Sequence, residues 1–174
     1  MAKSDSFFVR SLVVAGTTAD ETEIDLGAFV DVQDKTVLRI HNIAVQYTDA
    51  GGNLLDDITA TAATNASCRW QLTTQSQGTS LVTADDRSVI STGALTIYNA
   101  NSASQAGAVA FGHSIDVGPQ SWRAGYLVAT ESIYLLGERE TNMASGDINV
   151  AIVLECSTET MGTSQAMALA MSQQ

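Results

Sequence analysis

The segment at residues 147–157 constrains the fold of this chain most, because its apolar residues recur at every second position. They are Ile148, Val150, Ile152, Leu154 and Cys156. An extended backbone sends alternate side chains to opposite faces, so these five line one face of a β-sheet. The other face carries Asn149, Ala151, Val153 and Glu155. This mixture suits a surface that is partly wet or packed against another subunit, and the segment predicts a half-buried antiparallel strand.

Short runs with the same period of two recur along most of the chain, separated by glycine and small polar residues. The runs cover residues 6–15, 23–26, 36–47, 68–74, 94–98, 108–117, 126–130 and 132–136. The sequence contains one proline, so its turns are formed by Gly, Asn and Asp. It has no long helical periodicity and no alternation of strands with helices. We therefore predict an all-β fold, a two-sheet antiparallel sandwich, and favour a single eight-stranded jelly roll.

The run at residues 36–47 changes phase midway. Leu38 and Ile40 share one parity, whereas Ile43 and Val45 share the other. One extra residue in a strand moves every later side chain to the opposite face, so the sequence predicts a bulge or bend near residues 41–42. Farther along, the polar segment 137–146 is expected to join the strand before it to residues 147–157 as a hairpin.

The β-sandwich is expected to occupy residues 1–160 as one domain, because a chain of 174 residues can bury about two-thirds of its unfolded surface in a single core. Residues 161–174 form a separate C-terminal segment. Met167 and Met171 stand four positions apart there, as on one face of a short helix. An irregular tail fits the same segment, and both alternatives stay open.

The charge of the chain limits its partners. Nineteen acidic against eight basic residues give a net charge of −11. Such a surface repels phosphate backbones, so we expect no direct nucleic-acid binding. No apolar run approaches the roughly 20 residues of a membrane-spanning helix, so we expect no transmembrane segment. The N-terminal residues are interpreted as a first strand, because Asp5 and Arg10 interrupt the apolar core that a signal peptide needs.

The two cysteines, Cys68 and Cys156, each lie on the apolar face of a predicted strand. They could form a disulfide across the sandwich. Buried free thiols are favoured, because free cysteine is commonly a small core residue.

No recognisable catalytic or metal-binding motif accompanies these strands. His41 and His113 lack a second metal ligand at a recurrent spacing, so both are interpreted as structural. One acidic loop offers weak calcium candidates, since several oxygen ligands on a flexible loop suit a hard cation. They are Asp49, Asn53, Asp56 and Asp57. Their spacing departs from the EF-hand pattern and favours solvated turn carboxylates, so we expect no metal, no cofactor and no enzymatic activity.

Two pairs of residues are candidates for contacts with other molecules. Trp122 and Arg123 are of the types that are enriched at binding hot spots. The position of Trp122 after the turn at residues 118–119 suits a core residue at the edge of the sandwich equally well. Met167 and Met171 are the second pair, for the case in which the C-terminal segment packs on a neighbouring subunit.

Three segments, residues 36–47, 126–137 and 147–157, carry a resemblance to a known family. Apolar side chains occupy both faces of several strands, as Ile152 and Val153 illustrate. In strand pattern and size the chain is similar to the single jelly-roll major capsid proteins of membrane-containing icosahedral archaeal and bacterial viruses, whose jelly rolls stand upright on the shell. The likeness covers most of the chain and includes no diagnostic motif.

The resemblance implies a structural coat protein that self-assembles into an icosahedral capsid shell. Proteins of that family have no active site, so the resemblance implies no catalytic residues in this chain. Its partners are copies of itself, with or without a second capsid protein, and its termini and inter-strand loops make the contacts. The implied location is the virion, after assembly in the host cytoplasm.

Two other classes of β-rich protein stay open. A phage tail-tube or decoration protein is also small and self-associating. A carbohydrate-binding β-sandwich module needs exposed aromatic side chains, for which Trp70, Tyr98 and Trp122 are the candidates.

Overall fold

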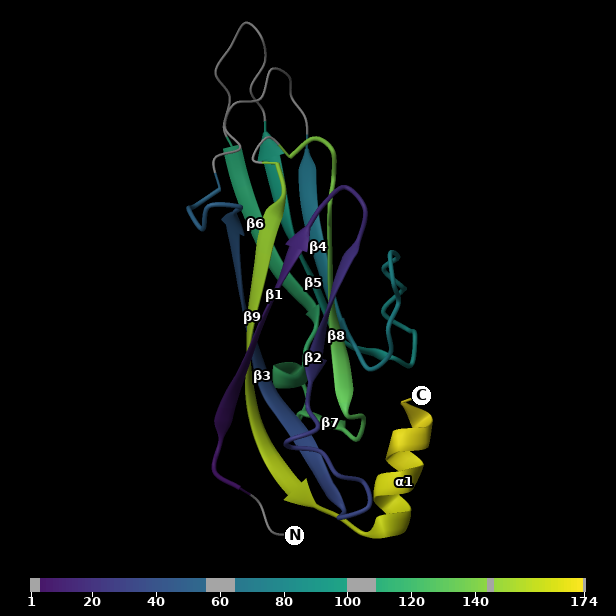
Figure 1. Cartoon of the computed structure of the whole chain (residues 1–174). Coiled ribbons are helices and arrows are strands. Elements are labelled where there is room, and N and C mark those ends of the chain that lie inside the picture. Colours follow the sequence, from purple (N-terminus) through teal and green to yellow (C-terminus); the bar gives the residue numbers. More distant parts are fainter. Residues whose placement is uncertain (1–3, 56–64, 100–108, 144–145, 174) are drawn as a thin grey trace, which may run out of the picture.

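The computed structural model describes residues 4–55, 65–99, 109–143 and 146–173, which form two antiparallel β-sheets packed face to face (Figure 1). The predicted all-β, two-sheet antiparallel sandwich is therefore confirmed. The four-stranded sheet consists, in order, of β1 (Phe7–Ala15), β9 (Ile148–Thr160), β3 (Thr36–Asp49) and β7 (Tyr126–Val128). The five-stranded sheet consists of β2 (Asp20–Asp25), β8 (Ser132–Arg139), β4 (Ala66–Thr73), β5 (Val89–Asn99) and β6 (Val109–Val117).

Two short helices accompany the sheets, the 3-10 helix η1 (Pro119–Ser121) and the α-helix α1 (Thr163–Ser172). Of the helix and the tail that the sequence leaves open for residues 161–174, the structure has the helix. Neither helix of the described chain has the length and apolar character needed to span a membrane.

The strand pairing is nested, which gives the sandwich its jelly-roll order. β1 pairs with β9, β2 with β8, β3 with β7 and β4 with β5, and every pair is antiparallel. The paired strands can be followed as one long two-stranded ribbon that wraps around a common core. The connection between β4 and β5 forms the tip of this ribbon. β6 lies outside the nesting, because it pairs with β5 at the end of the five-stranded sheet. The described chain therefore has nine strands, one more than the eight of the predicted jelly roll.

The segment before β9 is not the hairpin that the sequence predicts. β8 pairs with β2 and β4 in the five-stranded sheet, whereas β9 pairs with β1 and β3 in the other sheet. The connection after Arg139 therefore crosses from one sheet to the other. A polar, glycine-containing linker suits both cases, because turn chemistry does not determine which sheet the next strand joins.

The core lies between the two sheets. The five alternating residues of β9 are all buried there, together with Trp70 of β4 and Ile40 of β3. Each large apolar side chain removed from water contributes about 1.5–3 kcal/mol. The sheets approach each other closely at Gly137 of β8, where a Cβ atom would lie 2.9 Å from Cγ1 of Val13 and 3.1 Å from Cβ of Ala15. A larger side chain at this position would push β1 away from β8.

The predicted bulge in β3 is confirmed. Ile40 lies opposite Cys156 of β9 and Asn42 lies opposite Glu155, so His41 is the extra residue. Because the bulge switches the parity of the strand, Ile40 before it and Ile43 after it are both buried in the core.

Helix α1 lies at the lower end of the molecule in Figure 1, against the outer face of the four-stranded sheet. Ala166 of α1 packs with Val37 of β3 and with Ala129, and all three are buried. Beyond the helix, the buried amide of Gln173 binds the backbone of β7 and of the residue that follows it. Its Nε2 donates to the oxygen of Leu127 at 2.6 Å, and its Oε1 accepts from the nitrogen of Ala129 at 2.9 Å. The amide thereby occupies the place of a neighbouring strand and covers this sheet edge.

Candidate functional site

The first candidate site is a depression beside Trp122, on the outer face of the four-stranded sheet. The chain leaves β6, forms the single turn η1 at its only proline, and presents Trp122 and Arg123 before it enters β7. The depression has a volume of about 440 Å³, and its lining includes Arg39 of β3. Trp122 is 39% exposed, and its ring centre lies 5.6 Å from that of Tyr126. Trp122 is thus a half-buried residue at the surface and not a member of the core between the sheets.

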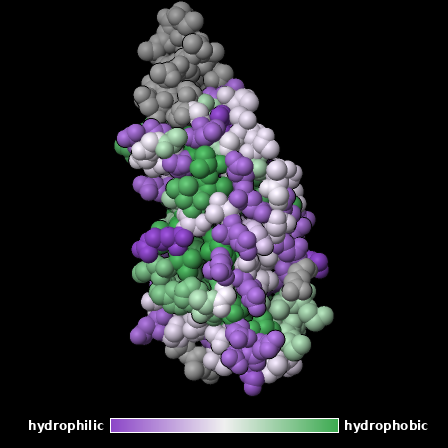
Figure 2. Space-filling model, in the orientation of Figure 1, coloured by the Kyte–Doolittle hydropathy of each residue, from purple (hydrophilic) through white to green (hydrophobic). Residues whose placement is uncertain are grey.

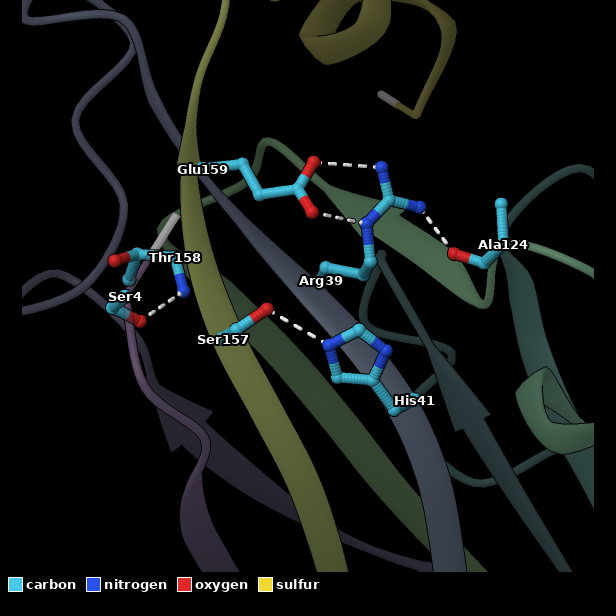
Figure 3. Close-up of polar contacts among 7 residues, drawn as sticks. All are labelled: Ser4, Arg39, His41, Ala124, Ser157, Thr158 and Glu159. Carbon is cyan, nitrogen blue, oxygen red and sulfur yellow. Dashed lines mark hydrogen bonds and ion pairs between the residues drawn. The ribbon is translucent and has the colours of Figure 1, made fainter. Parts of the chain in front are cut away.

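Arg39 and Glu159 form a two-point ion pair in this depression (Figure 3). Nε of Arg39 donates to Oε1 of Glu159 at 2.6 Å, and Nη2 donates to Oε2 at 2.7 Å. Nη1 donates to the backbone oxygen of Ala124. The hydrogen bond to Glu159 raises the pKa of Arg39 above its ordinary value, against the opposing effect of burial. Charge-assisted, bidentate pairing of this kind joins β3, β9 and the segment that carries Trp122.

The bulge residue His41 lies on the same face. Its Nε2 is 2.8 Å from Oγ of Ser157 on β9 (Figure 3). Also on β9, the backbone of Thr158 accepts a hydrogen bond from the nitrogen of Ser4 at 3.0 Å, and its own nitrogen donates to Oγ of Ser4 at 2.9 Å. These contacts tie the N-terminal segment and the bulge to β9.

His113 lies elsewhere, exposed on β6, with its ring edge-on to Tyr47 at 5.4 Å between centres. The two histidines are therefore not brought together. Within the ranges that the structure describes, no three His, Cys, Asp or Glu side chains are placed to hold a metal ion.

The second candidate site is formed by the methionines of α1. Met167 and Met171 are 53% and 73% exposed. Together with Val32, Ala129 and Ala170 they line another depression of about 440 Å³. Their spacing of four residues places both on one side of the helix, which borders the contact between α1 and the sheet. The sheet contact of α1 is made by its small residue Ala166 instead.

The acidic loop after β3 uses its first residue to close a turn. Oδ1 of Asp49 accepts from the nitrogen of Asn53 at 2.7 Å, and Oδ2 accepts from Nδ2 of Asn53 at 3.1 Å. These hydrogen bonds lower the pKa of Asp49 below its usual range. Asp56 and Asp57, the other two calcium candidates, lie outside the described residues. The described part of the loop thus holds a carboxylate that is already engaged by its own backbone.

Both cysteines are free and buried in the core. Burial raises the pKa of the Cys68 thiol and of the Cys156 thiol to about 12. The thiols therefore stay protonated at neutral pH, which is the condition of inert structural cysteines.

The sequence analysis did not identify the outer side chains of β1 as a site. Phe8, Leu12 and Val14 lie exposed on the face opposite the core. The available signal was the presence of apolar residues in both parities of this run, where Phe7 precedes Phe8 and Val13 precedes Val14. Such runs are typical of strands that are covered on both faces.

Comparison with known proteins finds no family model that matches the chain and no curated protein that matches it. The function therefore has to be inferred from the fold and from the surface.

Proposed function

We propose that this protein is a structural viral coat subunit that self-assembles into an icosahedral shell. The observation that carries the proposal is a jelly roll whose surface keeps large apolar side chains exposed. Phe8, Leu12 and Val14 stand together on one face of β1, and the other exposed side chains lie elsewhere: Leu54, Tyr98, Phe111, Trp122, Met167 and Met171. Jelly rolls are the fold of many capsid domains, and gathered apolar surface on a folded protein is typical of sites of protein association.

The acidity of the chain supports a layer that faces away from the genome. A net charge of −11 disfavours contact with phosphate backbones, so other components would handle nucleic acid or lipid. The same charge makes copies of the chain repel one another at low salt. Assembly is therefore expected to strengthen as salt screens this repulsion.

Electron microscopy of the purified protein tests the proposal. The protein is expressed alone and together with a second coat protein, concentrated, and imaged at low and at high salt. Capsomers or closed shells are the expected result. A strictly monomeric, compact particle at high concentration and high salt would contradict the proposal, whereas tubes or stacked rings would favour a phage tail-tube protein.

A carbohydrate-binding module is the second candidate function, because the exposed ring of Trp122 lines a depression and lies beside the ring of Tyr126. Aromatic rings offer an apolar surface together with a polar tip, which suits sugar binding. Trp70 is fully buried and cannot serve this purpose. The candidate predicts that an added glycan quenches tryptophan fluorescence in the native protein and not in Trp122→Ala. Failure of every glycan on an array to bind removes it.

A further inference from the structure

The outer face of the four-stranded sheet carries exposed apolar side chains where β1, β9 and β3 run side by side. On β1, Phe8, Leu12 and Val14 are 55%, 45% and 42% exposed. The outward residues of the neighbouring strands are small or uncharged along most of the same length. They are Asn149, Ala151 and Val153 on β9, and Asn42, Ala44, Gln46 and Thr48 on β3. Figure 2 shows apolar residues gathered along the side of the molecule on which β1 and β9 lie. We refer to these residues, with Arg10 and Glu155, as the β1–β9–β3 face.

The two charges on this face have opposite signs. In the antiparallel register, Arg10 lies opposite Val153 and Glu155 lies opposite Phe8, so the charges stand diagonally across the β1–β9 pair. The guanidinium carbon of Arg10 also lies 5.7 Å from the centre of the Phe8 ring. The chain as a whole has 19 acidic and eight basic residues. The β1–β9–β3 face is therefore neutral on a molecule that is strongly acidic.

We propose that a second copy of this chain docks on the β1–β9–β3 face, with Phe8 in the apolar contact and Arg10 of each copy near Glu155 of the other. A twofold axis that lies in the contact plane, midway between the two charges, exchanges their positions and so produces both ion pairs at once. A neutral face also brings two acidic molecules together with the least repulsion. The inference rests on the proposed self-assembly and names the surface through which it occurs.

The size of the face suits the centre of such a contact. A strand of nine residues rises about 3.3 Å per residue, and three strands spaced about 4.8 Å apart give a face of about 400 Å². Each partner in a standard interface buries about 800 Å². The face thus supplies about half of that area, with the apolar residues of β1 and β9 at its centre and the polar residues of β3 at its rim.

A pair of matched substitutions tests this inference. Phe8→Asp places a charge on the β1–β9–β3 face, and Phe111→Asp makes the same change on β6, where the phenylalanine is 50% exposed. Both positions are half exposed, so circular dichroism should report native folds for both variants. Sedimentation at a series of concentrations then measures self-association. We expect Phe8→Asp to raise the dissociation constant about tenfold or more and Phe111→Asp to leave it within about twofold of the wild type.

The outcomes separate this inference from the proposed function. If the wild type associates and Phe8→Asp associates equally well, or if both variants lose association alike, the β1–β9–β3 face is not the contact, while shells seen by microscopy would still support a coat subunit. If the wild type forms only a dimer that Phe8→Asp dissolves, the contact stands and the coat proposal fails. A wild type that stays monomeric but sediments with phosphatidylcholine vesicles would overturn the inference in favour of a lipid surface.

Discussion

The two ends of the outer face of the four-stranded sheet differ in whether their apolar side chains are covered. At the end near α1, Val37 points outward and is nevertheless fully buried, because Ala166 of the helix packs on it. On the β1–β9–β3 face, Phe8, Leu12 and Val14 also point outward and about half of each side chain remains exposed. The same sheet thus carries outward apolar residues at both ends, and among the residues that the structure describes only those at the α1 end are covered.

The edges of the sheet differ in the same way. The backbone beside β7 is bound by the amide of Gln173, and the backbone oxygen of Gln173 accepts hydrogen bonds from Thr74 and Gln75. The other edge is β1, which pairs with β9 alone in the described sheet. The C-terminal segment therefore acts as an internal cover, and the exposed apolar side chains of β1 are the reason for proposing that a second copy docks on the β1–β9–β3 face.

The largest expected effect comes from breaking the internal cover. Ala166→Asp forces a carboxylate into the buried contact between α1 and the sheet, and we expect it to lower the free energy of unfolding by about 3 kcal/mol, or to release the helix. Urea unfolding measures the change. Ala168→Asp, on the exposed side of the same helix, is the control and should unfold within about 0.5 kcal/mol of the wild type. Equal behaviour of the two variants would show that α1 does not cover the sheet.

The amide of Gln173 is the next element of that cover. Gln173→Ala removes both side-chain hydrogen bonds and leaves buried backbone groups of Leu127 and Ala129 without this partner. We expect a loss of about 1–3 kcal/mol and faster hydrogen exchange at the Ala129 amide. The exposed Gln165 supplies the control, since Gln165→Ala should leave exchange at Ala129 unchanged.

The core beneath the exposed face is expected to exclude solvent. The pH dependence of the unfolding free energy tests this, because it depends on the pKa of the buried thiols. Burial raises the pKa of Cys68 to about 12 from its ordinary 9.0, so the unfolded chain loses the thiol proton at a lower pH than the folded one. The stabilisation is fully present below pH 9.0 and is lost as pH rises from there toward about 12, by about 1.4 kcal/mol per pH unit at most. Unfolding measured between these limits should show a shallower slope in Cys68→Ala. An identical slope would mean that this thiol is open to solvent.

The smallest expected effect is at the uncovered end. Leu12→Thr places a β-branched residue, which suits a strand, on β1. It should change the unfolding free energy of the dilute monomer by less than about 1 kcal/mol, because the side chain is already half exposed. Denaturation at low protein concentration measures it. A loss comparable with that of Ala166→Asp would place Leu12 in the core and erase the contrast between the two ends.

The fold class and the bulge at His41 could be predicted because both follow from the alternation of apolar and polar residues over short stretches of sequence. Alternation in β9 determines which side chains are buried, and the parity change between Ile40 and Ile43 requires one extra residue. The partner of each strand is not local information. The connection after Arg139 has the chemistry of a hairpin loop, yet it joins different sheets, because nested pairing decides where β8 and β9 lie.

The candidate sites were predicted less completely, for a related reason. The spacing of Met167 and Met171 predicts a shared helix face, and the structure shows that this face is turned to solvent. The pairing of Arg39 with Glu159 could not be predicted, because the two residues are 120 positions apart and meet only through the β3–β9 register. The role of the Gln173 amide depends on where the helix before it ends, which no pattern in the sequence specifies.

Charge exchange between copies tests the contact on the β1–β9–β3 face most directly. Arg10→Glu and Glu155→Arg each place like charges against each other in a homodimer, so each variant alone should sediment as a monomer. An equimolar mixture pairs the two variants with opposite charges at both positions and should restore association to near the wild-type level. If the mixture stays monomeric while the wild type associates, or if either variant alone associates as the wild type does, copies of this protein do not meet through this face.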